Sequence, residues 1–469
     1  MARVKEIKNN NKANILDISS AQIIPIGFLL LILLGTILLM LPVSTADGQS
    51  TSLVTALFTS TTSVCVTGLV VVDTFAHWSL FGQIVILVLI QLGGLGIVAV
   101  TSTFMLALHK KFSLKNRLLL MDAFNLDTLR GLVRFLMGVL KGTFLVEGIG
   151  ACLYAIRFVP AFGAVKGIWY SIFTSISAFC NAGIDVLGPN SLIDYNKDLL
   201  VLITTMLLIV FGGLGYVVWF DVLTTIKNSY RMGKSGRKVS GFWMRLSEHS
   251  KLAITLTISL IVSGAILVFI LEYNNPDTIG NMGFGGKAIN SLFQSITFRT
   301  AGFAAVPQEG LTGATALMGC IFMFIGGSPV GTAGGVKTVT FFAVLISTVS
   351  FIRGRDECVV YNRKIATDTI QKATAIIAFS FMITFVLCVA LIAVEGLDTL
   401  DAIYEMVSAT ATVGLSRSVT PTLHTAGRLI VITAMYLGRI GPISLAIFFT
   451  NRKPDNNDVN YADGRYIVG

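Results

Sequence analysis

The chain has 469 residues, of which 54% are apolar and only 13% are charged. That charged share is about half of what a soluble domain usually carries, so these residues cannot cover a water-soluble globule of this size. The net charge of +10 does not indicate nucleic-acid binding, because the basic residues lie in short segments between apolar runs. The composition therefore predicts an integral membrane protein that contacts the lipid bilayer and has no nucleic-acid partner.

Eight apolar segments are long enough to cross a bilayer, which takes roughly 20 residues. The sixth is about twice that length and is interrupted by glycines, so we expect it to be broken. The segments are Ile23–Leu41, Leu80–Leu108, Phe135–Phe158, Leu199–Ile226, Leu252–Leu271, Leu311–Ile352, Ala373–Val394 and Leu429–Phe449. A cleaved signal peptide is the alternative for the first segment, but its length and the repeat that it opens favour a span.

Basic residues predict how these spans are oriented, because Lys and Arg collect in cytoplasmic segments. Four, six, seven and five of them lie in segments 1–22, 109–134, 227–251 and 353–372. None, one, two and one lie in the alternate segments 42–79, 159–196, 272–310 and 395–427. We expect a multi-pass protein of the plasma membrane with both termini in the cytoplasm.

The histidines and cysteines show no catalytic or metal-binding spacing. The sequence has no CxxC pair, and the HExxH, GxSxG and GxxxxGK[ST] patterns are also missing. We therefore expect that the protein is not an enzyme and that this chain holds no cofactor.

Each of the four external segments contains the same pattern, a short amphipathic stretch followed by a small-residue tripeptide that ends in glycine. An aromatic residue precedes that glycine by nine or ten positions in LFTSTTSVCVTGL, IFTSISAFCNAGI, LFQSITFRTAGF and IYEMVSATATVGL. These stretches are too short to span and too apolar for exposed loops, so they suit re-entrant half-helices sheltered by protein. Close helix packing would explain one small-residue motif, but four at matched positions favour an internal repeat.

The predicted fold is an all-α polytopic membrane protein with four parallel helix–pore loop–helix repeats. Eight spans and four re-entrant half-helices would surround one pore in a pseudo-fourfold arrangement. The expected divisions are an N-terminal tail 1–22, repeats at 23–108, 109–226, 227–352 and 353–450, and a C-terminal tail 451–469.

The four tripeptides have the chemistry of a potassium filter, in which rings of backbone carbonyls replace the hydration shell of the ion. Glycine permits the backbone conformations that turn successive carbonyls toward one axis. Each half-helix also presents the partial negative charge of its C-terminal end. The predicted layers are Val66, Asn181, Thr300 and Thr412; then Thr67, Ala182, Ala301 and Val413; then Gly68, Gly183, Gly302 and Gly414.

The residues VTGL, NAGI, RTAGF and TVGL occur in the order of a known family, with LGGLG, FGGLG, GGSPVGTAGGVK and GRIGP in the spans that follow. The chain resembles the Trk/Ktr/HKT superfamily of potassium transporters, and most of all its KtrB-type membrane subunit. The resemblance implies potassium uptake as a homodimer, with one pore in each subunit. It also implies a cytoplasmic ring of separately encoded RCK-type regulatory subunits that bind an adenine nucleotide. Glycine in all four tripeptides resembles the potassium-selective members.

The break in the sixth span is the predicted gate. Glycines and a proline weaken a helix, and unwound backbone inside a membrane persists only where protein or a water-filled cavity covers it. The resemblance implies that this loop obstructs the pore below the filter and that Arg439 contacts it. The predicted gate residues are Gly326, Gly327, Ser328, Gly331, Thr332, Gly334, Gly335 and Arg439. The alternatives are a packing notch for the loop and a side chain that reaches the membrane interface for Arg439.

An ion-coupled secondary symporter, driven by sodium or protons, is the alternative function, since symporters also use broken helices around a midplane site. Their usual marks are inverted repeats and intramembrane carboxylates, whereas the repeats here are parallel and Glu147 is the one obvious deep carboxylate. Asp73, Asp185 and Glu309 follow the tripeptides and are expected either to attract cations to the mouth of the pore or to be solvated loop charges.

Overall fold

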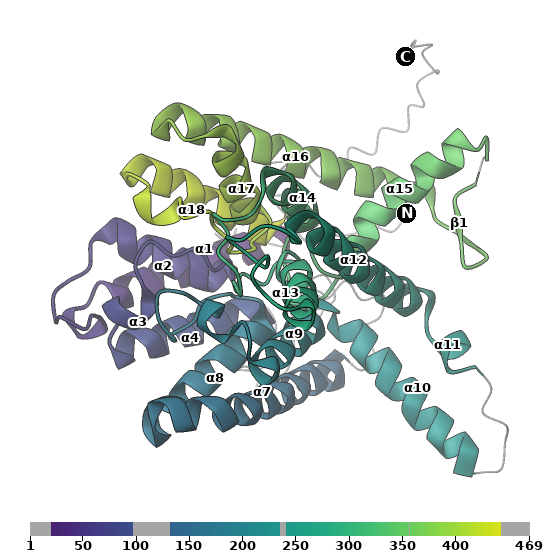
Figure 1. Cartoon of the computed structure of the whole chain (residues 1–469). Coiled ribbons are helices and arrows are strands. Elements are labelled where there is room, and N and C mark those ends of the chain that lie inside the picture. The colour runs from purple at the N-terminus through teal and green to yellow at the C-terminus, as the bar shows by residue number, and fades with distance from the viewer. Residues whose placement is uncertain (1–19, 97–131, 235–240, 356, 442–469) are drawn as a thin grey trace, which may run out of the picture.

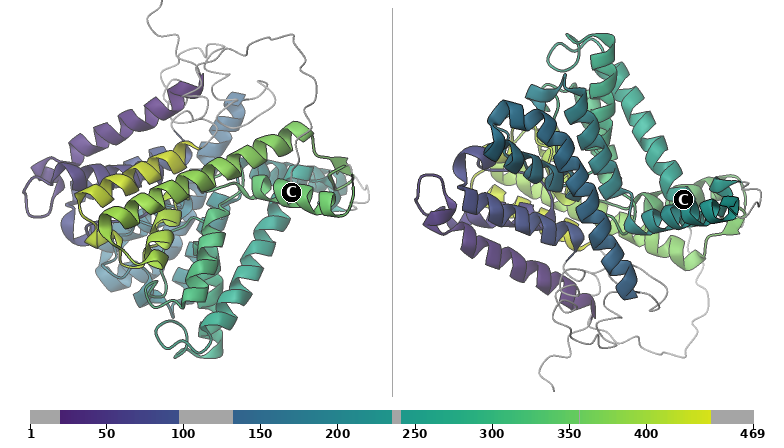
Figure 2. Two further views of the ribbon diagram at one scale, coloured as in Figure 1. Left: turned by 90° about the horizontal axis from the view of Figure 1, so that it is seen from above. Right: turned by 90° about the horizontal axis from the view of Figure 1, so that it is seen from below.

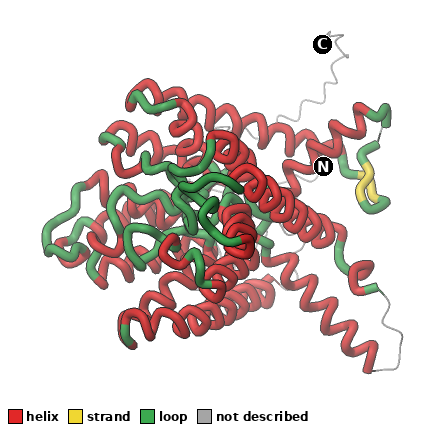
Figure 3. The backbone as a smooth tube through the Cα atoms, viewed as in Figure 1, coloured by secondary structure: helices red, strands yellow, loops and turns green. Residues whose placement is uncertain are grey.

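The computed structural model describes residues 20–96, 132–234, 241–355 and 357–441, and these residues are mostly helical (Figures 1 and 3). The helices of the first half are α1 (Ser20–Leu39), α2 (Leu53–Cys65), α3 (Thr74–His77), α4 (Leu80–Leu95), α7 (Leu132–Phe162), α8 (Ala164–Cys180), α9 (Leu199–Gly213) and α10 (Tyr216–Lys234). Those of the second half are α11 (Phe242–Arg245), α12 (Glu248–Glu272), α13 (Phe284–Thr297), α14 (Gly313–Phe324), α15 (Thr338–Ile352), α16 (Thr367–Glu395), α17 (Thr399–Thr410) and α18 (Thr425–Ile440). Strands β1 (Val359–Val360) and β2 (Arg363–Lys364) pair antiparallel.

Each predicted half-helix is a separate helix, called a short helix below, and it lies in the chain between apolar helices that belong to two predicted spans. These short helices are α2, α8, α13 and α17, with 13, 17, 14 and 12 residues. In each case at least one flanking long helix packs against the short one, as α7 and α9 do against α8. The helices predicted from the four sequence patterns are thus present.

The four groups pack on one another in a closed order. The second long helix of each group contacts the short helix of the next, in the pairs α4–α8, α9–α13, α14–α17 and α18–α2. The last pair joins the end of the chain to its beginning, and α18 also contacts α1. The two ends of the described chain therefore lie side by side, and the loops that follow the short helices gather at the centre (Figures 2 and 3).

Length and composition identify helices that are able to cross a membrane among the described residues. Helices α7, α12 and α16 qualify singly, and the bent pair α9–α10 qualifies if it counts as one span. Shorter apolar helices include Ile24–Leu39, Leu80–Leu95, Gly313–Phe324 and Thr338–Ile352. Residues 97–108 of the second predicted span and 442–449 of the eighth lie outside the described residues, as do residues 1–19 and the C-terminal tail.

The sixth predicted span is broken as expected, between Phe324 at the end of α14 and Thr338 at the start of α15. No break is predicted in the fourth span, Leu199–Ile226, but α9 and α10 meet there at a bend of 98°. Gly215, between the two helices, has φ +91°, a value that ends a right-handed helix and that only glycine adopts freely. Helix α10 consequently runs outward from the bend and contacts α11 and α12 (Figure 1).

Candidate functional site

The four short helices end in the same backbone turn. The first residue of each tripeptide has a left-handed conformation, with φ of 56° at Val66, 60° at Asn181, 62° at Thr300 and 51° at Thr412. The glycine that ends each tripeptide also has positive φ, at 102° for Gly68, 64° for Gly183, 82° for Gly302 and 95° for Gly414. Left-handed residues terminate helices and turn the chain sharply. The matched sequence pattern thus produces a matched conformation.

The middle residue of each tripeptide directs its amide back to the short helix. Thr67 N donates to Thr62 O at 2.9 Å, and Ala182 N donates to Ser177 O at 2.8 Å. The equivalent bonds run from Ala301 to Thr297 at 3.1 Å and from Val413 to Ser408 at 2.8 Å. In a trans peptide the N–H and C=O groups point in opposite directions. The carbonyls of Val66, Asn181, Thr300 and Thr412 therefore point away from the short helices.

The four glycines pack against one another's loops in cyclic order. A Cβ atom placed on Gly68 would lie 2.5 Å from Ala182 O, and one on Gly183 would lie 2.8 Å from Ala301 O. A Cβ on Gly302 would lie 2.6 Å from Val413 O, and one on Gly414 would meet Thr67 O. Each contact leads to the next tripeptide and the fourth returns to the first. The tripeptides therefore converge on one centre, too closely for any side chain at these glycines.

The carbonyl oxygens of these tripeptides have no hydrogen-bond donor in the described part of the chain. This holds for all three residues of each tripeptide, twelve oxygens in total. Nearly all buried carbonyls in proteins are paired, because an unpaired one costs free energy. The hydroxyls of Thr67, Thr300 and Thr412 and the amide nitrogen of Asn181 are also buried without a partner among the described residues. Such a concentration of unpaired oxygens indicates a site for a cation.

On one side of the tripeptides lies an open cavity of about 380 Å³, which we call the outer vestibule. All four glycines line it, together with Asp73 and Asp185. Burial raises the pKa of Asp185 to about 6, hydrogen bonds from Leu187 and Ser191 lower it, and the nearby charge of Asp73 raises it slightly. Glu309 is exposed and is not part of the vestibule wall.

The loop that breaks the sixth span, residues 325–337, also lies against the tripeptides. Thr332 Oγ1 donates to Phe179 O at 3.1 Å and to Asn181 Oδ1 at 3.3 Å, so the loop contacts the second tripeptide directly. Gly334 packs against Thr412 in the fourth tripeptide so closely that a Cβ atom would collide with Oγ1 of that threonine.

The bend between α9 and α10 holds this loop by backbone hydrogen bonds. Ser328 N donates to Gly213 O at 2.9 Å, and Thr332 N donates to Gly212 O at 3.1 Å. Helix α10 returns a bond from Tyr216 N to Val330 O at 3.0 Å. The polar backbone that two broken helices expose is therefore paired between them.

Three cationic side chains donate to carbonyls of the same loop. Arg439 Nη1 bonds to Thr332 O at 2.8 Å, and its Nη2 bonds to Gly93 O at 2.5 Å. Lys337 Nζ bonds to Ala333 O at 2.6 Å, and Arg299 Nη2 bonds to Gly326 O at 3.4 Å. The loop is thus fixed from the fourth group of helices, from within itself and from the residue that precedes the third tripeptide.

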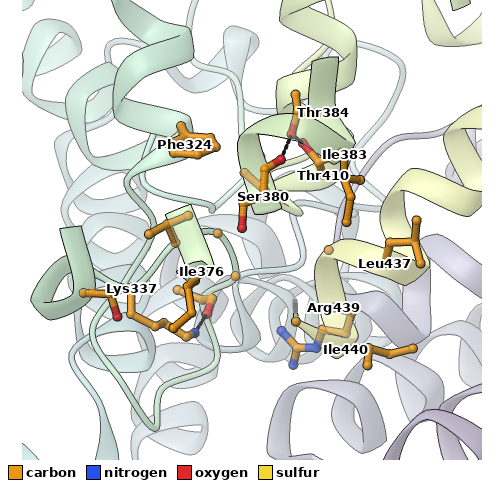
Figure 4. A pocket seen from close by; sticks show the side chains of 18 of the residues that line it. Phe324, Lys337, Ile376, Ser380, Ile383, Thr384, Thr410, Leu437, Arg439 and Ile440 are labelled. Carbon is orange, nitrogen blue, oxygen red and sulfur yellow. Dashed lines mark hydrogen bonds between the residues drawn. The ribbon is translucent and has the colours of Figure 1, made fainter. Parts of the chain in front are cut away.

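A second cavity, of about 350 Å³, lies beside the loop, and we call it the inner cavity. Lys337 and Arg439 lie on one side of it, with Ser380 and Thr384 of α16 across from them (Figure 4). Thr384 Oγ1 donates to Thr410 Oγ1 at 3.0 Å, so hydroxyls line part of the wall. Loop glycines 331, 334 and 335 complete the lining.

Comparison with known proteins gives the family. The family model described as TrkH, a cation transport protein, matches residues 10–461. The chain belongs to the TrkH family of cation transport proteins. It is 38% identical over 452 residues to the Ktr system potassium uptake protein B of Bacillus subtilis, which covers 96% of both chains. It is 36% identical to the potassium/sodium uptake protein NtpJ of Enterococcus hirae, with 95% of each covered.

The fold also matches a solved member of this family. The crystal structure of the potassium transporter TrkH from Vibrio parahaemolyticus superposes with a TM-score of 0.73 over 94% of this chain and 86% of that one. Sequence identity between the two is 15%, so the match concerns the fold. The resemblance predicted from the four tripeptides is confirmed by the family model.

The TrkH-family structure brings the predicted site residues together in two adjoining layers, the tripeptides and the 325–337 loop. Arg439 lies against that loop as the resemblance implied. Glu147, whose partner the sequence does not specify, accepts hydrogen bonds from Gln91 Nε2 at 3.1 and 3.3 Å, with Cys180 Sγ 4.0 Å away.

Sequence reasoning missed Arg299, the loop contact of Lys337 and the bend at Gly215. A signal for the bend is present, since FGGLG at 211–215 matches LGGLG at 92–96, and both motifs end on a positive-φ glycine.

Proposed function

We propose that this chain takes up potassium through one pore whose selectivity filter is made of the four tripeptides. The observation that carries the proposal is the set of twelve tripeptide carbonyl oxygens without a donor among the described residues. Carbonyl rings of this kind are the ligands of potassium filters. The Ktr relative from Bacillus subtilis is described as a potassium uptake protein, which supports potassium as the cation.

The proposed pore is pseudo-fourfold, with its axis where the glycines converge. Carbonyls of Val66, Asn181, Thr300 and Thr412 form the inner layer, followed outward by those of the middle residues and then of the glycines. The C-terminal ends of the four short helices add partial negative charge toward the axis. No tripeptide contains a carboxylate. Binding by dipoles without fixed charge favours release of the ion as well as its entry.

We further propose that the 325–337 loop is the gate. It lies between the tripeptides and the inner cavity, in contact with Asn181 and Thr412. Its gate residues are Gly326, Gly327, Ser328, Gly331, Thr332, Gly334 and Gly335, with Arg439 as the side chain that holds it closed. Each of the loop's hydrogen bonds to α9, α10 and Arg439 would have to break or shift for the loop to leave the axis.

The assembly that fits this pore is a plasma-membrane homodimer with both termini in the cytoplasm. A ring of cytoplasmic RCK-type subunits that bind an adenine nucleotide would move the gate. The family resemblance and the alternation of basic residues support this arrangement.

The alternative is an ion-coupled potassium symporter. The relative from Enterococcus hirae is described as a potassium/sodium uptake protein, which keeps sodium coupling open to test. Coupling to protons would call for a carboxylate on the pathway, and Glu147 instead pairs with Gln91 behind the second tripeptide. A passive pore is therefore the better interpretation of the geometry.

The proposal is tested by rubidium uptake in cells that lack their own potassium uptake. The wild-type chain, co-expressed with an RCK-type subunit, should restore uptake, and Gly68→Ser should lower both the uptake and its preference for potassium over sodium. Deletion of Ser328–Gly335 should raise flux. Absence of potassium-dependent growth with every partner would refute the potassium assignment. Uptake that vanishes without a sodium gradient would favour the symporter.

A further inference from the structure

Arg299 is a buried cation next to the third tripeptide and has few partners. Its side chain is 7% exposed, and it directly precedes Thr300. The ion pairs of the described residues include other arginines but not Arg299. Among the described residues the guanidinium makes one hydrogen bond, from Nη2 to Gly326 O at 3.4 Å, and Nε has no partner.

A small internal cavity adjoins this guanidinium. Arg299 lines it together with Thr257 of α12, Gly213 at the end of α9 and Gly327 of the 325–337 loop. The centre of a water-sized sphere has about 10 Å³ in which to move. Thr257 is 4% exposed, and its Oγ1 is the second buried atom here without a partner in the described part of the chain. The cavity is thus lined by two unsatisfied polar side chains, one from α12 and one from the turn that follows α13.

The size and polarity of this small cavity determine what can bind in it. A cavity holds a water when roughly 10–15 Å³ is open to the probe centre and at least two polar groups face it. A chloride ion is larger than a water molecule and does not fit this volume. Left dry, the cavity would strand a cationic donor and a hydroxyl in the membrane interior, where unpaired polar groups are costly.

We propose that this cavity binds one water molecule, which bridges Arg299 Nε and Thr257 Oγ1, and that Arg299 is a positioning residue that couples filter and gate. One end of the coupling is the Arg299–Thr300 peptide of the third tripeptide. The other is Gly326, where the 325–337 loop begins. A movement of the loop start would shift the guanidinium and, through it, the carbonyl of Thr300. The coupling rests on the proposed filter and gate, whereas the water site does not.

The chemistry requires an arginine. The guanidinium has donors on three nitrogens in a fixed fork, so it reaches Gly326 O and the water at once. A lysine has three donors on one nitrogen, so it would have to reach Gly326 O and the water from a single point at the end of a flexible stem.

The water site is tested directly by a high-resolution structure of the full chain in lipid nanodiscs. We expect one density peak within hydrogen-bonding distance of both Arg299 Nε and Thr257 Oγ1. Thr257→Val, which keeps the shape but loses the hydroxyl, should abolish the peak without moving the backbone. An empty cavity in a map that resolves other buried waters, or a peak of chloride size, would overturn the proposal.

The coupling is tested by rubidium uptake and its inhibition by sodium. Loss of one hydrogen bond in the coupling should change the potassium-over-sodium preference by about fivefold in Thr257→Val. Thr257→Ser should retain the wild-type preference, and Arg299→Lys should resemble Thr257→Val. Ser263→Ala is the control, because that hydroxyl lies on the same helix and bonds to Leu260 O, away from the cavity.

Equal preference in Thr257→Val and Thr257→Ser would refute the coupling. A wild-type chain that fails to transport potassium would refute the proposed function instead, and the density would still decide the water site.

Discussion

The backbone amide of Tyr216 donates a hydrogen bond to the carbonyl of Val330, 3.0 Å away, and so joins the first turn of α10 to the 325–337 loop. Ser328 and Thr332 also donate backbone hydrogen bonds to the end of α9. The loop is therefore held at the bend in the fourth predicted span by three backbone hydrogen bonds. Helix α10 runs outward from the bend, so a movement of its far end would act on these hydrogen bonds. The α9–α10 bend is therefore part of the proposed gate.

Gly215 at that bend is the first position to test. A Cβ atom there would press on Pro329 O, and φ is +91°, so Gly215→Ala should destabilise the bend by about 1–3 kcal/mol. We expect a lower unfolding temperature in detergent and higher rubidium flux without a partner subunit. Gly148→Ala is the matched control, because nothing lies within 4 Å of a Cβ at that helical site. Unchanged flux in Gly215→Ala would separate the bend from gating.

Gly68 tests the convergence of the tripeptides. An alanine there would place Cβ 2.5 Å from Ala182 O at a φ of +102°, so two loops must separate. Rubidium uptake should fall by at least about tenfold, since such backbone strain is worth 1–3 kcal/mol. Gly48→Ala has a similar positive φ of 73° with open space around it, and it should transport like the wild type. Equal losses in both variants would point to a general folding defect.

Arg439 tests whether its hydrogen bonds hold the 325–337 loop in place. Arg439→Gln removes the charge from the bonds to Thr332 O and Gly93 O, and hydrogen bonds to charged groups are worth about 1.5–3 kcal/mol each. The closed loop should lose stability, and flux without a partner subunit should rise by about tenfold or more. Arg428→Gln, in the first turn of the same helix, removes only a bond to Leu423 O and should leave flux unchanged. Lower flux in Arg439→Gln would argue that the arginine serves conduction itself.

Asp185 predicts a dependence on external pH. Burial raises the pKa of its carboxyl to about 6, so it is charged above that pH and becomes neutral as the pH falls through it. Loss of one negative charge in the vestibule should raise KM for rubidium by about threefold between pH 7 and pH 5. Asp185→Asn should show the higher KM at both pH values. Asp47→Asn, which lies outside the vestibule, should keep the pH dependence.

The sequence predicted the parts of the fold that a single segment encodes. The tripeptides were identifiable because an aromatic residue, a short apolar stretch and a glycine recur at matched spacing, and the break near Gly326 because glycines and a proline interrupt an apolar run. The bend at Gly215 was missed because the apolar run continues through it, and glycine pairs also occur in straight helices that pack closely.

Contacts between segments that are distant in the chain could not be predicted from the sequence. Thr257 belongs to α12 and Arg299 to the turn after α13, and nothing in their local sequence places them on one cavity. Lys337 is the last residue of the loop, but its bond to Ala333 O depends on how the loop folds back.

The 325–337 loop belongs to one of the four groups of helices. The tripeptides next to it come one from each group. In a channel made of identical subunits around one pore, the equivalent helix of every subunit moves when the pore opens. Here the 325–337 loop alone, released from Gly212, Gly213 and Arg439, would leave the axis of the proposed pore. The other three groups of helices would stay in place. Opening of the proposed pore would therefore be a one-sided event.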